Sequence, residues 1–219
     1  MEYNEAYYAG RHPLSANAFH HNLCSVLSRY CKRHARYADL GAGTGFLSTW
    51  LATDWGGQVT AVDGSEFALQ NISKTVPGVR TLQLDLNTVT YAQLQGPYDV
   101  AFMVHCLEHL DDPAKVLRQV ATCLAPDGRL IVVVPNCGWT FRRLVGDRTW
   151  GWNDPTHRHY FSVETLRQVM KTSFSDVSIQ TYPVPGLWLW CPALARRLAF
   201  RLGNHLIAIG QNNIAHGDA

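Results

Sequence analysis

The sequence predicts an α/β fold, in which a single doubly wound domain is built around a mostly parallel sheet. Short apolar runs alternate with helix-length segments through the middle of the chain, a pattern typical of parallel α/β sheets. A glycine-rich turn, GAGTG at residues 41–45, directly follows the first apolar run. The length of 219 residues fits one large domain better than two small ones.

Seven segments have the composition expected of strands. The run at 98–104 is continuously apolar, as expected where helices cover both faces of a sheet. The run at 128–136, GRLIVVVPN, is the clearest of them. The expected strands span residues 37–40, 58–63, 79–86, 98–104, 128–136, 177–182 and 205–209.

Capping residues indicate where the helices begin. We expect Ser65 to cap a helix that runs to about residue 75, and Ser162 to cap one that runs to about residue 171. Asp112 and Pro113 form an N-cap and a first-turn proline. Further helices are expected at 46–52 and, as an apolar insertion, at about 192–202.

The composition describes an ordinary globular protein and excludes several classes. Apolar residues make up 47% of the chain, and a net charge of +2 gives no electrostatic case for binding nucleic acid. The sequence has no apolar run of 18 residues, so no membrane-spanning helix is expected. The polar residues 1–18 lack the apolar core of a signal peptide, and the six cysteines show no metal-site spacing. We therefore expect a cytoplasmic protein with reduced thiols.

The glycine-rich turn predicts a binding site for an adenine-containing cofactor. Glycine lets a ligand approach the backbone, and the following helix N-terminus offers unpaired N–H groups. Gly41, Gly43 and Gly45 spell G-x-G-x-G, so Phe46 stands where the dinucleotide motif has its third glycine. A P-loop is excluded because the turn has no Gly-Lys-Ser/Thr. A tight strand-to-helix turn without a ligand is the remaining alternative.

Together with its neighbouring motifs, the turn resembles the class I S-adenosylmethionine-dependent methyltransferases from about residue 37 to residue 184. The motifs that carry the resemblance are DLGAGTG at 39–45, the acid Asp63, QLDL at 83–86, HCLEHLDDP at 105–113 and LAPDGRLIVVVPN at 124–136. The resemblance implies a Rossmann-like fold with a seven-stranded sheet and an antiparallel last strand. It also implies an N-terminal cap helix region at 1–36, a cofactor-binding core at 37–136, and an acceptor-side loop, helix and final strands at 137–219.

The resemblance implies a role for each residue of the cofactor site. Asp63 would accept both ribose hydroxyls, and Asp39 would orient the amino group of the cofactor. Asp85 would reach the exocyclic amine of adenine, Leu86 would pack on the ring, and His105 would lie beside the sulfonium. The expected cofactor-binding residues are Asp39, Gly41, Ala42, Gly43, Gly45, Asp63, Gly64, Ser65, Asp85, Leu86 and His105. Roles as helix caps or solvated loop charges remain the alternative for the acids.

Histidines are the candidate catalytic residues, because methyl transfer to an oxygen nucleophile needs a base with a pKa near neutrality. The topology would bring His105, His109, His157 and His159 to the carboxyl edge of the fourth and fifth strands, where open α/β sheets bind ligands. In an extended segment, the alternating His157 and His159 would share a face. The candidate general bases are His157, His159 and His109, and a purely structural role of HRHYF at 157–161 is the alternative.

A metal-assisted reaction is a second possibility at the same place. The segment HCLEHL at 105–110 is similar to the E-x-x-E-H motif of magnesium-assisted O-methyltransferases, including ubiquinone-pathway and small-RNA 2′-O-methyltransferases. Glu108 and His109 match that motif, and His157 or His159 would complete the set. His105 departs from it, because the motif has a carboxylate there and imidazole disfavours magnesium relative to zinc. We therefore expect no resident metal.

The acceptor side of the chain is rich in aromatic residues. Five of the seven tryptophans lie there, at positions 139, 150, 152, 188 and 190, and aromatic walls suit a flat or lipophilic acceptor. The apolar segment 187–206 carries three arginines and suits either contact with a membrane surface or a lid over the site. The sequence thus predicts O-methylation of a small aromatic or lipophilic acceptor by in-line transfer from S-adenosylmethionine, with S-adenosylhomocysteine as the product. An NAD-dependent oxidoreductase and a non-catalytic S-adenosylmethionine-binding partner protein are the alternatives.

Overall fold

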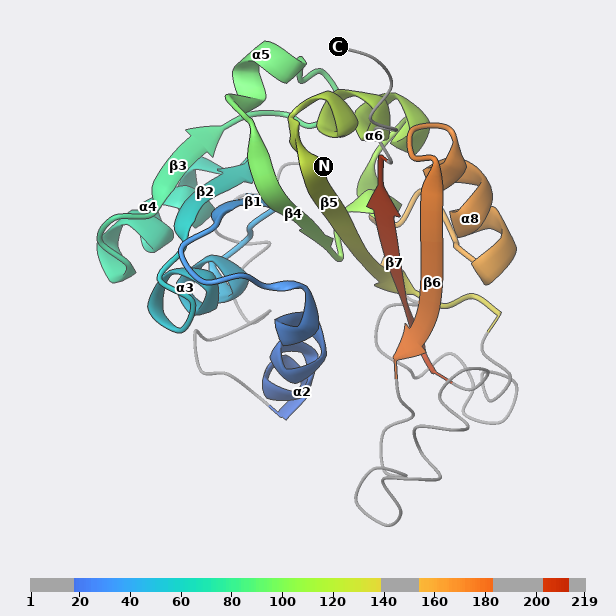
Figure 1. Cartoon of the computed structure of the whole chain (residues 1–219), viewed down its shortest axis with the longest axis horizontal. Coiled ribbons are helices and arrows are strands. Elements are labelled where there is room, and N and C mark those ends of the chain that lie inside the picture. Colours follow the sequence, from blue (N-terminus) through green and yellow to red (C-terminus); the bar gives the residue numbers. More distant parts are fainter. Residues whose placement is uncertain (1–17, 139–153, 183–202, 213–219) are drawn as a thin grey trace.

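The computed structural model describes residues 18–138, 154–182 and 203–212. At its centre lies a seven-stranded sheet with the strand order β3-β2-β1-β4-β5-β7-β6 (Figure 1). The strands are β1 (Arg36–Leu40), β2 (Gln58–Asp63), β3 (Arg80–Gln83), β4 (Tyr98–Val104), β5 (Leu124–Pro135), β6 (Asp176–Tyr182) and β7 (His205–Gln211). Strand β7 runs antiparallel to both of its neighbours, and the pairs from β3 to β5 are parallel. The predicted α/β sheet with an antiparallel last strand is confirmed.

Six α-helices and two short 3₁₀ helices flank this sheet in the described part of the chain. They are α2 (Ala18–Leu27), η1 (Ser28–Tyr30), α3 (Phe46–Thr53), α4 (Glu66–Thr75), α5 (Tyr91–Leu94), η2 (Leu107–His109), α6 (Pro113–Thr122) and α8 (Val163–Lys171). Each predicted cap is formed, because the side chains of Ser65, Asp112 and Ser162 accept hydrogen bonds from backbone N–H groups of the first helical turn. The predicted starts of α4, α6 and α8 are confirmed.

The core has two layers, one on each face of the sheet (Figure 1). Helices α5, α6 and α8 pack on one face, and helices α2 and α3 pack on the other. Strand β5 shows how the sequence divides between them: Leu130, Val132 and Val134 face the first layer, whereas Ile131 and Val133 face the second. All five are fully buried, and such burial stabilises by about 1.5–3 kcal/mol per side chain. Because both faces are covered, residues 130–134 of β5 are apolar without interruption.

Two strands differ from the sequence prediction by three residues or more at one end, and the other strands agree to within two residues. Strand β5 begins at Leu124 rather than at 128, because Leu124 pairs with Tyr98 and the register shifts before the next pair. Strand β3 ends at Gln83 rather than at 86. The chain then turns, with the N–H of Thr88 donating to the carbonyl of Asp85 at 3.0 Å. Asp85 and Leu86 therefore lie in a turn after the strand.

The topology gathers several chain segments at the carboxyl edge of the parallel strands. Strands β1, β2, β4 and β5 all end there, since they run in the same direction. Strand β7 runs the opposite way, so its first residue, His205, lies at this edge between Pro135 and Tyr182. This edge carries most of the predicted site residues.

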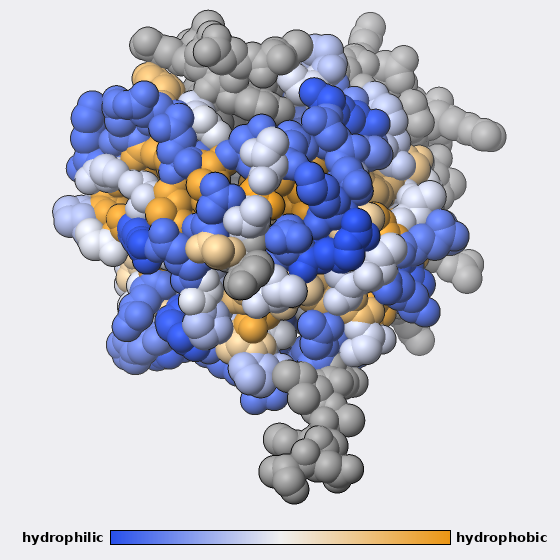
Figure 2. All heavy atoms as spheres, turned by 90° about the horizontal axis from the view of Figure 1, so that it is seen from above, coloured by the Kyte–Doolittle hydropathy of each residue, from blue (hydrophilic) through white to orange (hydrophobic). Residues whose placement is uncertain are grey.

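The described surface is largely hydrophilic in the view of Figure 2, with apolar residues in smaller areas between polar ones. Among the described residues, Tyr160 is the large hydrophobic side chain counted as exposed, at 53%. Within the described ranges, no helix has the length and apolar character needed to cross a membrane. The expected helix at 192–202 and the five acceptor-side tryptophans lie outside the described residues.

Candidate functional site

The glycine-rich turn leads from β1 into α3 with an unusual backbone. Gly41, Gly43 and Gly45 have φ angles of 77°, 51° and 87°, a region that glycine adopts far more readily than other residues. The N–H groups of Gly41 and Ala42 both donate to the carbonyl of Val62, at 2.8 and 3.0 Å. These bonds hold the turn against the end of β2.

The packing of the protein itself explains two of these glycines. A Cβ at Gly41 would lie 2.5 Å from Sγ of Cys106, and one at Gly45 would lie 2.4 Å from Cγ1 of Ile72. Both distances are far below van der Waals contact, so neither position admits a side chain. The sequence attributed the close approach at Gly41 and Gly45 to a ligand, but Cys106 and helix α4 also approach these two glycines closely.

Asp63 ends β2 and binds the glycine turn to the start of α4. Its carboxylate accepts hydrogen bonds from the N–H of Gly43 and the N–H of Ser65, each at 2.8 Å. The residue is only 8% exposed. A carboxylate has about four acceptor positions, which makes a buried carboxylate here a suitable acceptor for a diol.

Asp39 lies behind the same turn and is completely buried. It accepts a hydrogen bond from Oγ of Ser48 at 2.6 Å. Burial raises the pKa of Asp39 to about 6; the Ser48 hydrogen bond opposes this rise and the charge of Asp63 adds to it. Two buried acids close together favour a positively charged ligand, because a cation relieves both their desolvation and their mutual repulsion.

The residues expected to border the adenine differ in how accessible they are. Gly64 is exposed, and a Cβ there would meet only the carbonyl oxygen of Leu84, at 3.9 Å. Asp85 is exposed, and its carboxylate accepts from the N–H of Asn87 at 2.9 Å, while Leu86 is buried. The glycine turn, the acids and the space beside Gly64 fit an adenosyl cofactor, whereas the described contacts of Asp85 are those of a local turn.

His105 follows β4 with a φ angle of 52°, which is rare for a residue other than glycine. Its N–H donates to the carbonyl of Val133 at 2.9 Å, so the strained residue is tied to β5. Its Nδ1 lies 3.3 Å from Oε1 of Glu108, and its ring meets that of His205 edge-to-face at 5.0 Å. Such strain costs about 1–3 kcal/mol and is characteristic of functional sites.

Glu108, His109 and His157 form a compact group beside His105. One donor atom from each of the three lies within 4.8 Å of the other two. The rings of His109 and His157 meet edge-to-face, with centroids 4.7 Å apart. The N–H groups of Arg158 and His159 donate to the carbonyl of Glu108 at 2.9 and 3.1 Å, which joins the returning chain to η2.

The structure separates the two histidines that sequence alternation placed on one face. His157 joins the group with Glu108 and His109. The ring of His159 instead stacks on Phe161, and its Nε2 lies 3.4 Å from the carbonyl oxygen of Asp111. The reason is that the consecutive N–H groups of Arg158 and His159 both donate to the carbonyl of Glu108, whereas consecutive N–H groups of an extended strand point to opposite sides.

Burial also affects the charge of two histidines, His157 and His205. It lowers the pKa of His157, an effect that the nearby Glu108 carboxylate partly offsets. It lowers the pKa of His205 far more, and the neighbouring His105 acts in the same direction. His157 is therefore mostly neutral at pH 7, as a proton acceptor must be.

Three polar residues at this edge were not identified from the sequence. The hydroxyl oxygen of Thr156 lies 2.9 Å from Nδ1 of His109. The same hydroxyl donates a hydrogen bond to the carboxylate of Asp154. His205 packs against His105. Thr156 is 47 positions from His109, so no local pattern could pair them. The antiparallel direction of the last strand was a signal that could have placed His205 here.

The donor set of the group can be compared with the needs of a metal ion. Glu108 is 1% exposed, and its Oε2 is buried without a hydrogen-bond partner in the described part of the chain. Two imidazoles and one carboxylate suit zinc or another transition metal better than magnesium, which favours oxygen ligands. The residues thus fit a transition metal and fit magnesium poorly.

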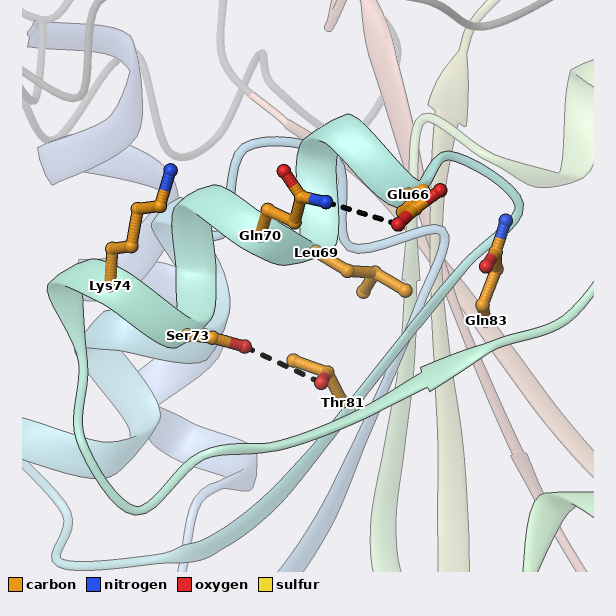
Figure 3. Close-up of a pocket in the computed structure, with 7 residues that line it drawn as sticks. All are labelled: Glu66, Leu69, Gln70, Ser73, Lys74, Thr81 and Gln83. Atoms are coloured by element: carbon orange, nitrogen blue, oxygen red, sulfur yellow. Dashed lines mark hydrogen bonds between the residues drawn. The ribbon is translucent and has the colours of Figure 1, made fainter.

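A groove of about 370 Å³ lies elsewhere, between α4 and the edge strand β3 (Figure 3). Its polar side chains bind one another: Gln70 donates to Glu66 at 3.0 Å, and the hydroxyls of Ser73 and Thr81 lie 3.5 Å apart. None of the predicted site residues lines it. The groove is therefore not part of the site at the carboxyl edge.

Comparison with known proteins decides the family. A family model described as a methyltransferase domain matches residues 16–173, most of the chain. The chain belongs to this methyltransferase family. The resemblance to class I S-adenosylmethionine-dependent methyltransferases and the Rossmann-like fold are thereby confirmed.

Individual relatives agree with this assignment. A ubiquinone biosynthesis O-methyltransferase of Caulobacter sp. (strain K31) is 37% identical over 105 residues, which cover 46% of this chain and 41% of that protein. The chain thus spans less than half the length of that curated relative. An S-adenosylmethionine-dependent methyltransferase from Archaeoglobus fulgidus has the same fold, with a TM-score of 0.66, 18% identity, and coverage of 88% of this chain and 94% of the other. A plantazolicin methyltransferase, whose structure was solved in complex with S-adenosylhomocysteine (SAH), has a TM-score of 0.66 and 16% identity. The match covers 95% of this chain and 88% of the other.

Proposed function

We propose that this methyltransferase transfers a methyl group from S-adenosylmethionine to a hydroxyl of a small aromatic or lipophilic acceptor. The observation that carries the proposal is the contact between the glycine turn and the segment that leads into the histidine group. Gly41 packs directly on Cys106, which stands between His105 and η2 in the chain. A cofactor held at the turn would therefore lie beside a buried carboxylate and two imidazoles. The ubiquinone O-methyltransferase relatives support oxygen as the acceptor atom.

The cofactor, when bound, supplies a methyl group on a positively charged sulfonium. The residues of this chain bind and orient it: Asp63 accepts hydrogen bonds from the ribose diol, and Asp39 attracts the amino group. Gly64 and Ser65 border the adenine where the surface is open.

The histidine group handles the proton of the acceptor. As the acceptor oxygen forms its bond to the methyl carbon, the carbon–sulfur bond breaks and the hydroxyl proton passes to an imidazole nitrogen of the His109–His157 pair. Burial keeps His157 neutral, so this imidazole is able to accept that proton at pH 7. His159 lies outside the group and is not expected to take part.

A divalent transition metal is the second candidate role for the same group. Glu108, His109 and His157 would hold it, and the buried Oε2 of Glu108 favours this reading. Such an ion would supply Lewis acidity toward the acceptor oxygen. Turnover measured after chelation, and again after adding zinc or magnesium, separates the two roles.

The first test is calorimetric titration of the protein with S-adenosylhomocysteine, with NAD as the parallel control. Micromolar binding of the former and none of the latter is expected. Binding of NAD alone would replace the proposal with the oxidoreductase alternative. A panel of catechols and other phenols then tests turnover, and product analysis identifies the methylated atom. Cofactor binding without turnover of any acceptor would favour the non-catalytic partner protein.

The remaining expectations extend this proposal. We propose a small-molecule acceptor rather than a nucleic acid, because the net charge is only +2. Cytoplasmic location and peripheral membrane contact through the apolar segment near residue 200 also remain proposals, and that segment lies largely outside the described residues.

A further inference from the structure

Asp154, Thr156 and His109 are joined in that order by hydrogen bonds, with the ring of His109 at the end of the chain. Thr156 is 7% exposed, so its hydroxyl is largely shielded from water. Its Oγ1 donates to Oδ1 of Asp154 at 2.5 Å, and its N–H donates to the same oxygen at 2.9 Å. On the other side, Oγ1 lies 2.9 Å from Nδ1 of His109, and the Thr156 carbonyl oxygen lies 3.3 Å from the same nitrogen.

This arrangement fixes the direction of each hydrogen bond. A hydroxyl has one hydrogen, and Thr156 gives it to the carboxylate of Asp154, which can only accept. Toward His109 the hydroxyl must therefore accept, and the carbonyl beside it can only accept as well. Both contacts require a proton on Nδ1 of His109. In the neutral ring the lone pair then lies on Nε2.

We propose that Asp154 and Thr156 are positioning residues that hold His109 in the Nδ1–H tautomer, which makes Nε2 the nitrogen that accepts the acceptor proton. The catalytic part of this inference rests on the proposed function. The tautomer itself does not depend on it. Free histidine favours the opposite tautomer, so the hydrogen-bonded chain would have to impose this one.

The local fold makes the chain rigid. The N–H of His157 donates to the carbonyl of Asp154 at 3.1 Å, which closes a turn around Thr156. The N–H groups of Arg158 and His159 bind the carbonyl of Glu108, the residue before His109. The positioning pair and the ring that it orients are thus held on both sides by backbone hydrogen bonds.

The direct test is nitrogen-15 NMR of the imidazole rings in the full chain after dialysis against a chelator, at a pH above the histidine titrations. The His109 signals are assigned by their loss in His109→Gln. We expect the shifts of the Nδ1–H tautomer in the unaltered protein and in Thr156→Ser. In Thr156→Val, which keeps the carbonyl but lacks the hydroxyl, we expect a shift toward Nε2–H. An Nε2–H tautomer of His109 in the unaltered protein would overturn the inference.

The kinetic test compares the same variants once an acceptor has been found. Thr156→Val should lower kcat by about tenfold or more, while the KM of the acceptor and the affinity for S-adenosylhomocysteine stay within about twofold. Thr156→Ser should restore kcat. If Thr156→Val changes the tautomer but leaves kcat unaltered, the catalytic role of Nε2 is excluded. Failure of the unaltered protein to bind S-adenosylhomocysteine would instead reject the proposed function and leave the NMR result intact.

Discussion

The cofactor side and the acceptor side of the carboxyl edge bury opposite kinds of titratable group. On the cofactor side, Asp39 and Asp63 are buried carboxyls, and burial raises the pKa of Asp39 to about 6. On the acceptor side, burial lowers the pKa of His157 and lowers that of His205 still more. Burial opposes charge on both sides, but its chemical consequence differs.

Burial therefore makes a nearby cation favourable to Asp39 and Asp63, and it leaves His157 and His205 neutral. This division suits a reaction that brings a sulfonium to one side and removes a proton on the other. The two sides meet where Gly41 packs on Cys106, one residue after the strained His105. Substitutions on one side should therefore affect binding of the cofactor, and substitutions on the other should affect turnover.

The largest expected effect is on the acceptor side. His109→Gln and His157→Gln should lower kcat by about 10²–10⁴-fold, the usual contribution of a general base. Affinity for S-adenosylhomocysteine should change little. His159→Gln is the matched control, because its ring lies on Phe161 outside the group. Steady-state kinetics measures kcat for all three variants. A larger loss of kcat in His159→Gln than in the other two would contradict the assignment of the base to His109 and His157.

The glycine turn should respond mainly in stability. Gly45→Ala forces a Cβ to within 2.4 Å of Ile72 at a φ of 87° and should cost about 2–5 kcal/mol of unfolding free energy. Gly78→Ala is the control, since its φ is 97° but nothing lies within 4 Å, so only the backbone strain of about 1–2 kcal/mol applies. Urea denaturation measures both. Equal losses would show that the contact with Ile72 relaxes without cost.

On the cofactor side, Asp63→Ala should weaken binding of S-adenosylhomocysteine by about 1.5–3 kcal/mol, the range for a hydrogen bond to a charged group. Calorimetry gives the affinity, and circular dichroism checks that the turn still folds, because Asp63 also accepts from Gly43 and Ser65. Asp176→Asn, at an exposed position on β6, serves as the control. Unaltered affinity in a folded Asp63→Ala would remove the assignment to the ribose.

The smallest effect concerns pH. Asp39 is protonated below its pKa of about 6, and only its charged form attracts the amino group of the cofactor. Affinity for S-adenosylhomocysteine should therefore fall as the pH drops from 6 to 5, by up to about tenfold or 1.4 kcal/mol. Calorimetry at both pH values should show a smaller fall in Asp39→Asn. The same fall in both proteins would assign the dependence to another group.

The sequence by itself determined most of the cofactor side. The glycines, Asp39 and Asp63 lie within one strand–helix–strand unit, and the rules for such units are local: glycine at positive φ, an acid where the second strand ends, and a serine cap on the next helix. The strand lengths were less predictable. Strand β3 stops at Gln83 because the chain turns at Asp85, and alternation alone does not mark that turn.

Only the tertiary structure decided the acceptor side. The sequence predicted that the histidines would gather at this edge, but alternation grouped His157 with His159. The backbone bends at Arg158 and His159, whose consecutive N–H groups both bind the Glu108 carbonyl, and the two histidines therefore have different neighbours. The pairing of Thr156 with His109 joins positions 47 apart, and His205 arrives because β7 runs antiparallel to β5. Such contacts depend on how the chain returns to the sheet, and no local periodicity encodes that return.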